Sequence, residues 1–239
     1  MDKVKLLNRI DKKYCFNINQ LEVILNLIKN DYFVLEVEGK KISRYKTLYY
    51  DTPNFFLYNL HHKGKLNRYK IRHRTYLENN KSFFEIKFKN NKYRTIKKRI
   101  KDFENPEEIN EKRENFIIEK SKLNPKNFIP ALWINYSRIT LVNRQSPERL
   151  TIDINLEYLK GENKINLNKL IIAEVKQESK NKSPFISAMK NLNIREGSIS
   201  KYAMGIALTT PQVKKNNFKE KIRTILKTTN DNKYIFTGN

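Results

Sequence analysis

The sequence has 239 residues, enough to bury the core of one large domain or two small ones. Its 49 Lys and Arg residues outnumber 25 Asp and Glu residues, and the net charge of +24 predicts an anionic partner such as nucleic acid, polyphosphate, a nucleotide or an acidic membrane surface. The 13 Phe and 13 Tyr residues exclude a disordered chain, because disordered sequences combine high charge with few aromatic residues.

The cysteine count and the hydropathy pattern bear on the compartment. Cys15 is the single cysteine, which excludes an internal disulfide framework, and its apolar neighbours predict a small buried side chain. No apolar run approaches the ~20 residues of a membrane span, and the first 14 residues lack the apolar core of a signal peptide. These features favour a soluble protein in the cytoplasm.

The first hundred residues predict one helix among strands. Residues 9–16 alternate like a strand, and residues 17–32 have apolar side chains at helical spacing behind a cap at Asn17 or Asn19. The next segments share aromatic, β-branched or alternating residues and are joined by turn-like sequences: 42–52, 66–77, 81–90 and 93–100. This order predicts an antiparallel meander.

The rest of the chain predicts more strands and then helices. Residues 103–130 are mixed, with short helices expected near Pro106 and Pro125. Strand patterns resume at 133–144, 148–159 and 170–179. Helical patterns follow at 183–194, 200–210 and 213–228. We expect an α+β fold: a single antiparallel eight-stranded β tunnel or barrel with flanking helices over residues 1–210, and a basic helical extension with a polar tail over 211–239.

One face of the predicted sheet is charged and the other is apolar. Arg68, Lys70, Arg72 and Arg74 alternate along one strand and therefore point to the same face. Other strands add further charged residues to that face: Glu85, Lys87, Lys97, Arg99, Arg138, Arg149, Asp153, Glu174 and Lys176. The positions between them are mostly apolar, as in a sheet with two different environments.

Two interpretations of this charged face compete. In an ordinary half-exposed sheet the charges point to water, although a solvated face usually mixes charge signs to relieve cross-strand repulsion. In a closed sheet the charged face surrounds a wet tunnel with room for one small ligand. Arginine forms strong bidentate bonds with phosphate oxygens, so a bound polyanion explains the unbroken cation row better than solvent does.

The carboxylates on this face are candidate metal ligands. Glu174, Glu85 and Asp153 could hold Mg²⁺ or Mn²⁺ together with phosphate oxygens, because both ions prefer oxygen ligands. For Glu85 and Asp153, neutralisation of a neighbouring cation is an equally open interpretation. The sequence contains no glycine-rich phosphate loop, and its three histidines do not have the spacing of a metal site.

Eight segments in this order carry a family resemblance: RIDKKY, YYDT, YKIRHRTY, FFEIKFK, YSRIT, ERLTIDINL, IIAEVKQ and SISKYAMGI. From Arg9 to Leu208 the sequence resembles the VTC domain, the polyphosphate polymerase domain of the vacuolar transporter chaperone complex and its bacterial relatives. That family belongs to the triphosphate tunnel metalloenzymes. The resemblance implies an eight-stranded tunnel that extends inorganic polyphosphate with the γ-phosphate of ATP, using a divalent metal, usually Mn²⁺ and otherwise Mg²⁺.

The resemblance also assigns roles to particular residues. It implies that Glu174 binds the metal, that Arg72, Arg74, Lys87 and Lys201 are catalytic, and that phosphate is bound by these four together with Lys13, Arg138, Arg149 and Ser200. The tunnel interpretation adds Arg68, Lys70, Lys97, Arg99 and Lys176 as substrate-binding residues. The sequence departs from the family pattern at Ser198, where relatives often have lysine, and at Asp11, where they often have glutamate.

Other functions stay open. A hydrolase of the same fold would cleave triphosphate with water, and a binding module would hold polyphosphate without turnover. A nucleic-acid binder is less favoured, because it would place aromatic residues on the basic face. In residues 213–228 the apolar stripe favours packing on the domain over docking to a membrane partner or gathering polyphosphate: Val213, Phe218, Ile222, Ile225 and Leu226. The family resemblance implies work beside a membrane protein that takes up the product.

Overall fold

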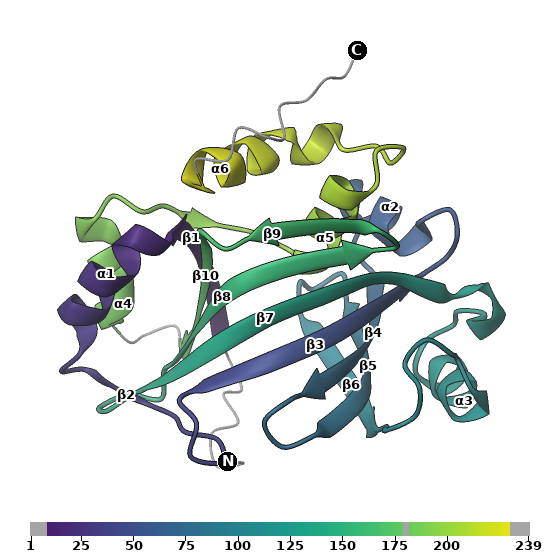
Figure 1. The fold of residues 1–239 in the computed structure, drawn as a ribbon, viewed down its shortest axis with the longest axis horizontal. Helices are drawn as coiled ribbons and strands as arrows, with labels where there is room; N and C mark the ends of the chain where they lie inside the picture. The colour runs from purple at the N-terminus through teal and green to yellow at the C-terminus, as the bar shows by residue number, and fades with distance from the viewer. Residues whose placement is uncertain (1–8, 179–181, 230–239) are drawn as a thin grey trace.

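The computed structural model describes residues 9–178 and 182–229, which form a curved antiparallel sheet with helices around it (Figure 1). The strands are β1 (Arg9–Asn17), β2 (Tyr32–Val34), β3 (Ile42–Asp51), β4 (Arg68–Tyr76), β5 (Lys81–Lys89), β6 (Thr95–Lys101), β7 (Ile129–Asn143), β8 (Arg149–Lys160), β9 (Asn163–Leu167), β10 (Leu170–Glu178) and β11 (Glu196–Gly197). The helices are α1 (Leu21–Ile28), α2 (Phe56–His62), α3 (Glu111–Lys120), α4 (Pro184–Asn191), α5 (Lys201–Thr209) and α6 (Lys219–Thr229), with short 3-10 turns η1 (Ile18–Gln20), η2 (Pro125–Asn127) and η3 (Asn216–Phe218).

The sheet is tunnel-like but open along one side. Its strands lie in the order β11, β1, β10, β8, β7, β3, β4, β5 and β6, with β2 added to β7 and β9 to β8. The expected α+β fold, an antiparallel tunnel sheet with flanking helices, is therefore confirmed. The closed barrel is wrong, since no strand pairing in the described part of the chain joins β6 to β1 or β11. The described residues form 11 strands, not eight.

The two edges explain why the sheet stays open. The edge strand β6 is exposed along nearly its whole length and carries Lys97, Lys98, Arg99 and Lys101. Charged residues on an edge oppose pairing with another strand. The other edge, β11, is only two residues long and pairs with Lys13 and Tyr14 of β1. Neither edge offers a long, uncharged partner for closure.

Apolar residues on the outer face of the sheet pack under helices. Under α1 and α4 lies one cluster that includes Leu150, Ile152 and Val175 of the sheet. Under α3 lies a second that includes Ile71, Phe84 and Ile86. Each of these apolar residues is next in sequence to a charged residue, whose side chain points to the opposite face. The prediction that one face of the sheet is apolar is therefore confirmed.

Helix α5 covers one end of the inner face. Its Tyr202, Met204 and Ile206 belong to a third cluster, which includes Leu132 and Ile134 of β7 on the concave side of the sheet. In Figure 1 α2, α5 and α6 gather at this end, above the strands. The inner face is thus apolar under α5 and charged beyond it, so α5 closes one end of the tunnel.

A buried carboxylate ties α2 and α5 to the sheet. Asp51, the last residue of β3, accepts hydrogen bonds from the backbone N–H groups of Leu57 at 2.8 Å and Tyr58 at 2.9 Å. It also accepts one from the hydroxyl of Tyr202. The YYDT sequence therefore has a structural function: it fixes the covered end of the tunnel.

Most predicted helices have their expected places, with local causes in the sequence. The helix predicted at 17–32 is η1 followed by α1, and Asn17 forms a capping box with Gln20. The helices predicted at 183–194 and 200–210 are α4 and α5, with Ser183 and Ser200 as N-caps. Among the described residues no helix is long and apolar enough to cross a membrane.

The basic stretch at 213–228 forms η3 and α6. Phe218, Ile222 and Ile225 are buried in the cluster that also contains α5, so this stretch packs on the domain as expected. The division of the chain at residue 210 stays a prediction, and the polar tail over 230–239 lies outside the described residues.

Candidate active site

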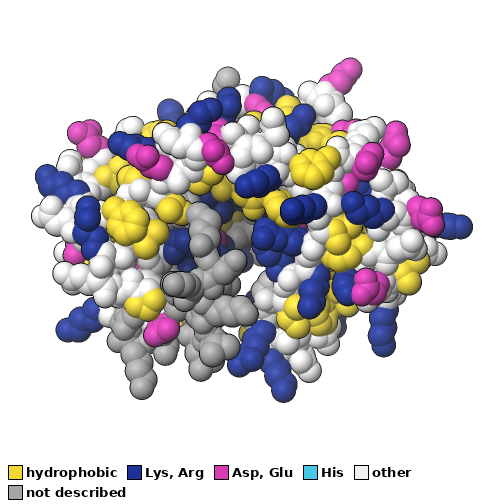
Figure 2. All heavy atoms as spheres, turned by 90° about the horizontal axis from the view of Figure 1, so that it is seen from below, with side chains coloured by type: hydrophobic (Ala, Val, Ile, Leu, Met, Phe, Trp, Pro, Cys, Tyr) yellow, Lys and Arg dark blue, Asp and Glu magenta, His cyan; other side chains and the backbone are white. Residues whose placement is uncertain are grey.

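The predicted charged face is the inner face of the tunnel sheet. Cross-strand pairing places Arg72 opposite Glu85 and Lys70 opposite Lys87. On the other side of the tunnel it places Arg138 opposite Asp153. Figure 2, seen from the side opposite α6, shows a hollow with Lys and Arg side chains inside it and around its rim. The register therefore brings residues from distant parts of the sequence around one space.

Arg72 and Glu85 form a buried ion pair in the wall of this hollow. The Arg72 Nε and Nη2 atoms lie 2.7 and 2.5 Å from Glu85 Oε2, and Nη1 donates to the Tyr49 hydroxyl at 3.0 Å. Lys97 reaches the other carboxylate oxygen at 3.3 Å. Burial raises the pKa of Glu85, but Arg72 and the other surrounding cations outweigh it and hold the pKa well below its usual range. Glu85 thus serves as an anionic anchor for the Arg72 guanidinium.

Asp153 likewise forms ion pairs with cations in the opposite wall of the hollow. Arg138 binds it through two parallel bonds, Nε to Oδ1 at 2.6 Å and Nη2 to Oδ2 at 2.9 Å, and the Lys201 ammonium contacts Oδ2. Burial raises the pKa of Asp153, but Lys201 and Arg138 together lower it below its usual range. Asp153 therefore stays ionised and holds two cations that the sequence resemblance assigns to phosphate binding.

Stacked tyrosines support the arginines from behind. The rings of Tyr45 and Tyr136 stack with centroids 5.0 Å apart. The Arg74 guanidinium lies 5.4 Å from the Tyr45 centroid and the Arg138 guanidinium 5.4 Å from that of Tyr136, within cation–π range. The residue pattern did not by itself predict this role for Tyr45 and Tyr136. The signal was present in the alternation, which puts Tyr45 and Tyr49 on one face and Tyr136 beside Arg138.

Glu174 has a more open environment than the other two carboxylates. Lys176 and Lys13 approach the same oxygen, Oε1, at 3.2 and 3.5 Å. Burial raises the pKa of Glu174, but Lys176 and Lys13 outweigh it and lower the pKa to about 2. The carboxylate is ionised at neutral pH, its side chain is 19% exposed, and its contacts with cations are longer than those of Glu85 with Arg72 or of Asp153 with Arg138. It therefore fits a metal ligand better than Glu85 or Asp153, whose oxygens are all bonded to cations.

A metal held by protein ligands alone does not fit this tunnel. Across residues 9–178 and 182–229 no three His, Cys, Asp or Glu side chains lie close enough together to hold an ion. Mg²⁺ and Mn²⁺ commonly bind one or two carboxylates and complete their coordination with water and substrate phosphates. The donor set thus fits an ion that shares Glu174 with phosphate oxygens.

Three inner cations form no ion pair with a carboxylate among the described residues. Arg74 donates from Nε to the Thr47 hydroxyl at 3.3 Å, and Lys70 donates to Ser200 at 2.9 Å.

The pKa of Lys87 is well below its usual range because Arg72, burial and Arg74 all oppose its charge. Burial, followed by repulsion from Arg68 and Lys13, lowers the pKa of Lys70 to about 7. The tunnel holds more positive charge than its own carboxylates compensate.

The remaining predicted residues lie nearer the rim. Arg149 and Arg99 are exposed, and Arg99 stacks 4.4 Å from the Phe83 ring centroid. Arg68 donates to the Lys65 carbonyl. Lys97 is also exposed, although it reaches Glu85. These four positions surround the inner group of buried Arg72 and Arg74 and half-buried Arg138 and Lys87 rather than belonging to it.

The comparisons agree with the architecture. The family model of the VTC domain matches residues 8–210. No curated protein matches the chain. A proposed adenylate cyclase from Vibrio parahaemolyticus is similar in structure, with 10% identity, a TM-score of 0.50 and coverage of 84% of this chain and 99% of that one. A proposed adenylyl cyclase from Hippeastrum, described as having a dominant triphosphatase activity, shares 12% identity at a TM-score of 0.49, over 83% of this chain and 96% of that one.

The structural likeness at this low identity concerns the fold alone. The family model, in contrast, covers most of the sequence and includes every strand that contributes an inner cation, from β1 to β10. This chain belongs to the VTC domain family.

Proposed function

We propose that this protein transfers the γ-phosphoryl group of ATP onto a growing inorganic polyphosphate chain inside the tunnel, with Mn²⁺ or Mg²⁺ as cofactor. The observation that carries the proposal is the excess of inner cations: Arg74, Lys70 and Lys87 lie on the concave face and form no ion pair with a carboxylate of the described chain. A triphosphate supplies the missing negative charge, and its oxygens match the donors that these side chains present.

Some inner residues orient the cations, and others are available to bind phosphate. Glu85 fixes Arg72, and Asp153 fixes Arg138 and Lys201, so these cations are oriented before substrate enters. Arg74 keeps both terminal nitrogens without a described protein acceptor and can therefore bind phosphate oxygens in a bidentate manner. Such preorganised charge stabilises phosphoryl transfer mainly by position and electrostatics.

Glu174 is the residue we assign to the metal. A divalent ion bound there would neutralise charge on the transferring phosphate group. We assign Glu85 and Asp153 to the ion pairs described above, which is the alternative that the sequence left open. The neighbouring Lys176 and Lys13 keep Glu174 ionised and would turn toward phosphate when the ion binds its carboxylate.

The surface features fit phosphate better than nucleic acid. Tyr45 and Tyr136 do lie on the cationic face, contrary to the sequence argument, but both rings are buried and stack on each other. They offer no free surface on which bases could stack. Action at the cytoplasmic side of a membrane, beside a membrane protein that accepts the product, remains part of this proposal.

The decisive experiment incubates the purified protein with ATP and Mn²⁺ and measures ADP, free phosphate and polyphosphate length. ADP with long polyphosphate and little free phosphate supports the polymerase. Free phosphate without polymer would replace it with a triphosphatase of the same fold, in which water is the acceptor. Binding without turnover would leave a polyphosphate-binding module.

Two variants test the assigned residues. We expect Arg74→Ala to weaken tripolyphosphate binding by roughly 10- to 100-fold, the effect of losing a charge-assisted bond. We expect Glu174→Gln to lower kcat strongly while the Kd of tripolyphosphate without metal changes less than about threefold. Arg195→Ala, a change at an exposed arginine, is the control. Equal affinity of Arg74→Ala and the wild type would remove Arg74 from the site.

A further inference from the structure

A groove of about 1110 Å³ lies where the sheet is open. One wall contains residues of β1 and β11, including Lys13 and Gly197, and the opposite wall contains residues of β4, β5 and β6. A third side is formed by α2, η3 and α6. We call this cavity the side groove. It lies between the two sheet edges that do not pair.

The side groove is strongly basic. Its lining includes six cationic side chains: Lys13, Arg68, Lys70, Lys89, Arg94 and Lys221. Its two carboxylates are both engaged, Glu196 with Lys12 at 3.3 Å and Asp11 with Lys176 at 3.9 Å. Of the six cations, only Lys13 forms an ion pair within the described residues, with Glu174. The groove therefore lacks the negative charge that would balance its walls.

The groove and the tunnel share residues. Lys70 lines the groove and also belongs to the inner row of β4 that continues to Arg72 and Arg74. Its ammonium group lies 2.9 Å from the Ser200 hydroxyl, which caps α5 beside Lys201. A polyanion can therefore extend from the tunnel into the groove without leaving a cationic surface.

The C-terminal extension supplies part of the wall. The Phe218 ring packs against His62, with centroids 5.2 Å apart, and the Asn217 backbone N–H donates to His62 Nε2 at 3.2 Å. Lys221 donates to the Ser198 hydroxyl at 2.8 Å. These contacts fix the first turn of α6 over the groove. Asn217, Phe218 and Lys221 all lie beyond the 8–210 segment that matches the family model.

We propose that the side groove binds internal phosphates of a polyphosphate chain whose end lies in the tunnel, and that the C-terminal extension forms one wall of this second subsite. The inference rests on the proposed function, since it assigns the same polymer to both places. Because the groove lies along the unpaired edges, the chain enters it from the side and need not be threaded by an end. The cations come from several elements on facing walls, as an extended polymer of repeating charge requires.

A binding experiment separates the groove from the tunnel. The triple variant Lys89→Ala/Arg94→Ala/Lys221→Ala removes three groove cations that make no ion pair among the described residues. We expect its affinity for long-chain polyphosphate to fall at least about tenfold, while its affinity for tripolyphosphate changes less than about twofold. The control variant Lys98→Ala/Lys219→Ala/Lys227→Ala removes three exposed lysines outside the groove and should bind both probes like the wild type.

Salt dependence gives a second measurement on the same variants. Each lost phosphate contact lowers the slope of log affinity against log salt by roughly 0.7 on the scale for single-stranded polyanions, so the triple variant should lose about two units. We expect this decrease in slope for binding of the long chain but not for binding of tripolyphosphate. Thermal unfolding of the variants checks that they fold like the wild type.

The outcomes separate the two proposals. If the wild type binds tripolyphosphate and the triple variant binds long chains as tightly as the wild type does, the groove inference is overturned and the proposed function stands. If the wild type binds no tripolyphosphate, the proposed function fails. An equal loss of oligothymidylate binding in the triple variant would overturn the assignment to polyphosphate in favour of a general polyanion surface.

Side entry has its own test. A polyphosphate chain that carries bulky groups at both ends cannot thread through a tunnel. Its capped ends cannot occupy the tunnel, so we expect weaker binding than for the uncapped chain. The affinity that remains in the wild type comes from the groove and should be lost in the triple variant. Failure of the capped chain to bind would contradict side entry.

Discussion

Charge compensation in the tunnel is unequal from residue to residue. Glu85, Asp153 and Glu174 each lie between two cations. Lys70 and Lys87, in contrast, face other cations, and both have lowered pKa values. The acids therefore stay ionised, whereas protonation of these two lysines is disfavoured in the free protein. An anionic ligand removes that disadvantage.

Lys70 should couple triphosphate binding to proton uptake. Burial and the neighbouring Arg68 lower its pKa to about 7 in the free protein, and a bound triphosphate raises it again. Above pH 7 the complex therefore holds more protons than the free protein, and affinity falls as the pH rises. The folding stability of the free protein depends on pH in the opposite direction. The pKa of Lys70 is lower in the folded state than in the unfolded state, so stability increases as the pH rises from about 7 toward 10.

Calorimetry in two buffers of different ionisation enthalpy measures this proton uptake. At about pH 8.5 we expect a clear uptake on tripolyphosphate binding in the wild type and a smaller one in Lys70→Met. Lys219→Met, at an exposed lysine of α6, should behave like the wild type. The same uptake in Lys70→Met and the wild type would show that Lys70 does not respond to the ligand.

At this scale the sequence predicted which side chains share a face but not their partners. Alternation alone placed Arg72 and Arg74 on one face, because side-chain direction in a strand has a period of two. Whether Glu85 binds a metal or an arginine depends on cross-strand register, which joins residues that local patterns do not relate. The support from Tyr45 was missed because an alternating aromatic residue fits a core equally well.

Among the elements, α5 depends on a glycine for its close approach to the sheet. A Cβ atom at Gly205 would lie 2.7 Å from Cδ1 of Tyr158 and would also clash with Leu132. Both neighbours are almost completely buried, so they have little freedom to move. This close contact is what allows α5 to cover the end of the tunnel.

We therefore expect Gly205→Ala to destabilise the protein by about 1–3 kcal/mol, the usual cost of overpacking a core. Alanine favours a helix by up to about 1 kcal/mol over glycine, so the net loss is at the low end of that range if the sheet adjusts. Urea unfolding measures it. Gly197→Ala is the matched control, since a Cβ there meets nothing within 4 Å. A gain in stability from Gly205→Ala would contradict the close packing.

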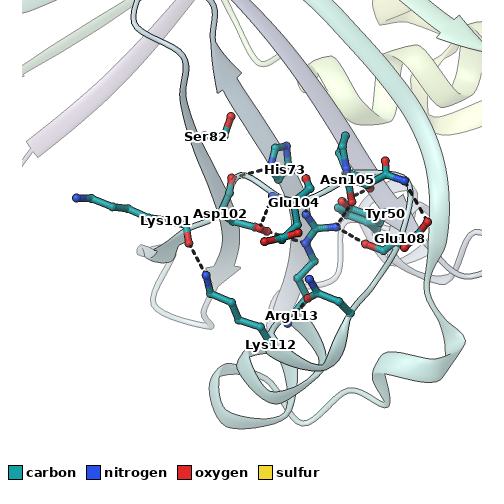
Figure 3. A network of polar contacts seen from close by, with 12 residues as sticks. Tyr50, His73, Ser82, Lys101, Asp102, Glu104, Asn105, Glu108, Lys112 and Arg113 are labelled. Atoms are coloured by element: carbon teal, nitrogen blue, oxygen red, sulfur yellow. Dashed lines mark hydrogen bonds and ion pairs between the residues drawn. The ribbon is translucent and has the colours of Figure 1, made fainter.

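Helix α3 is held to the outer face of the sheet by a buried polar network (Figure 3). Arg113 and Asp102 are both fully buried, and their Nε and Oδ2 atoms lie 2.6 Å apart. Arg113 also donates to the backbone carbonyls of Asn105 at 2.6 Å and Glu104 at 3.0 Å. One side chain thus provides hydrogen-bond donors for several backbone carbonyl groups of the loop between β6 and α3.

Removal of this guanidinium should cost far more than removal of a surface charge. We expect Arg113→Met to lose about 3–5 kcal/mol in urea unfolding, because it leaves the Asp102 carboxylate buried without a partner. Arg113→Met with Asp102→Leu should lose less than the single change. Lys112→Ala, which removes an exposed neighbour, should cost under about 0.5 kcal/mol. Tripolyphosphate affinity of the folded Arg113→Met variant should be that of the wild type, since α3 lies outside the tunnel.

For the whole molecule, the sequence predicted the class of fold but not the short strands or whether the edge strands pair. The short strands β2, β9 and β11 have three, five and two residues, too few for a periodic signal. Closure depends on whether β6 can pair with β1 or β11, a contact between segments roughly 80 to 100 residues apart. Composition and alternation do not report such a contact. The resulting opening is what makes the side groove available.

The net charge of +24 should make the fold sensitive to polyanions. Self-repulsion lowers the stability of a compact chain with so large a charge, and a ligand that binds the folded state stabilises it by mass action. At 100 times its Kd, tripolyphosphate should add about 2.7 kcal/mol, which corresponds to a rise in Tm of roughly 5–10 °C for a chain of this size. Chloride at equal ionic strength only screens charges and should raise Tm less.

A thermal scan of the wild type and Arg74→Ala distinguishes the two effects. Screening acts on the whole surface, so chloride should raise the Tm of both proteins equally. Tripolyphosphate acts through the tunnel, so at a fixed concentration its effect should be much smaller in Arg74→Ala. If tripolyphosphate and chloride raised the Tm of the wild type equally, the stabilisation would come from general screening. The inner cations would then lack the specific anion site that their arrangement indicates.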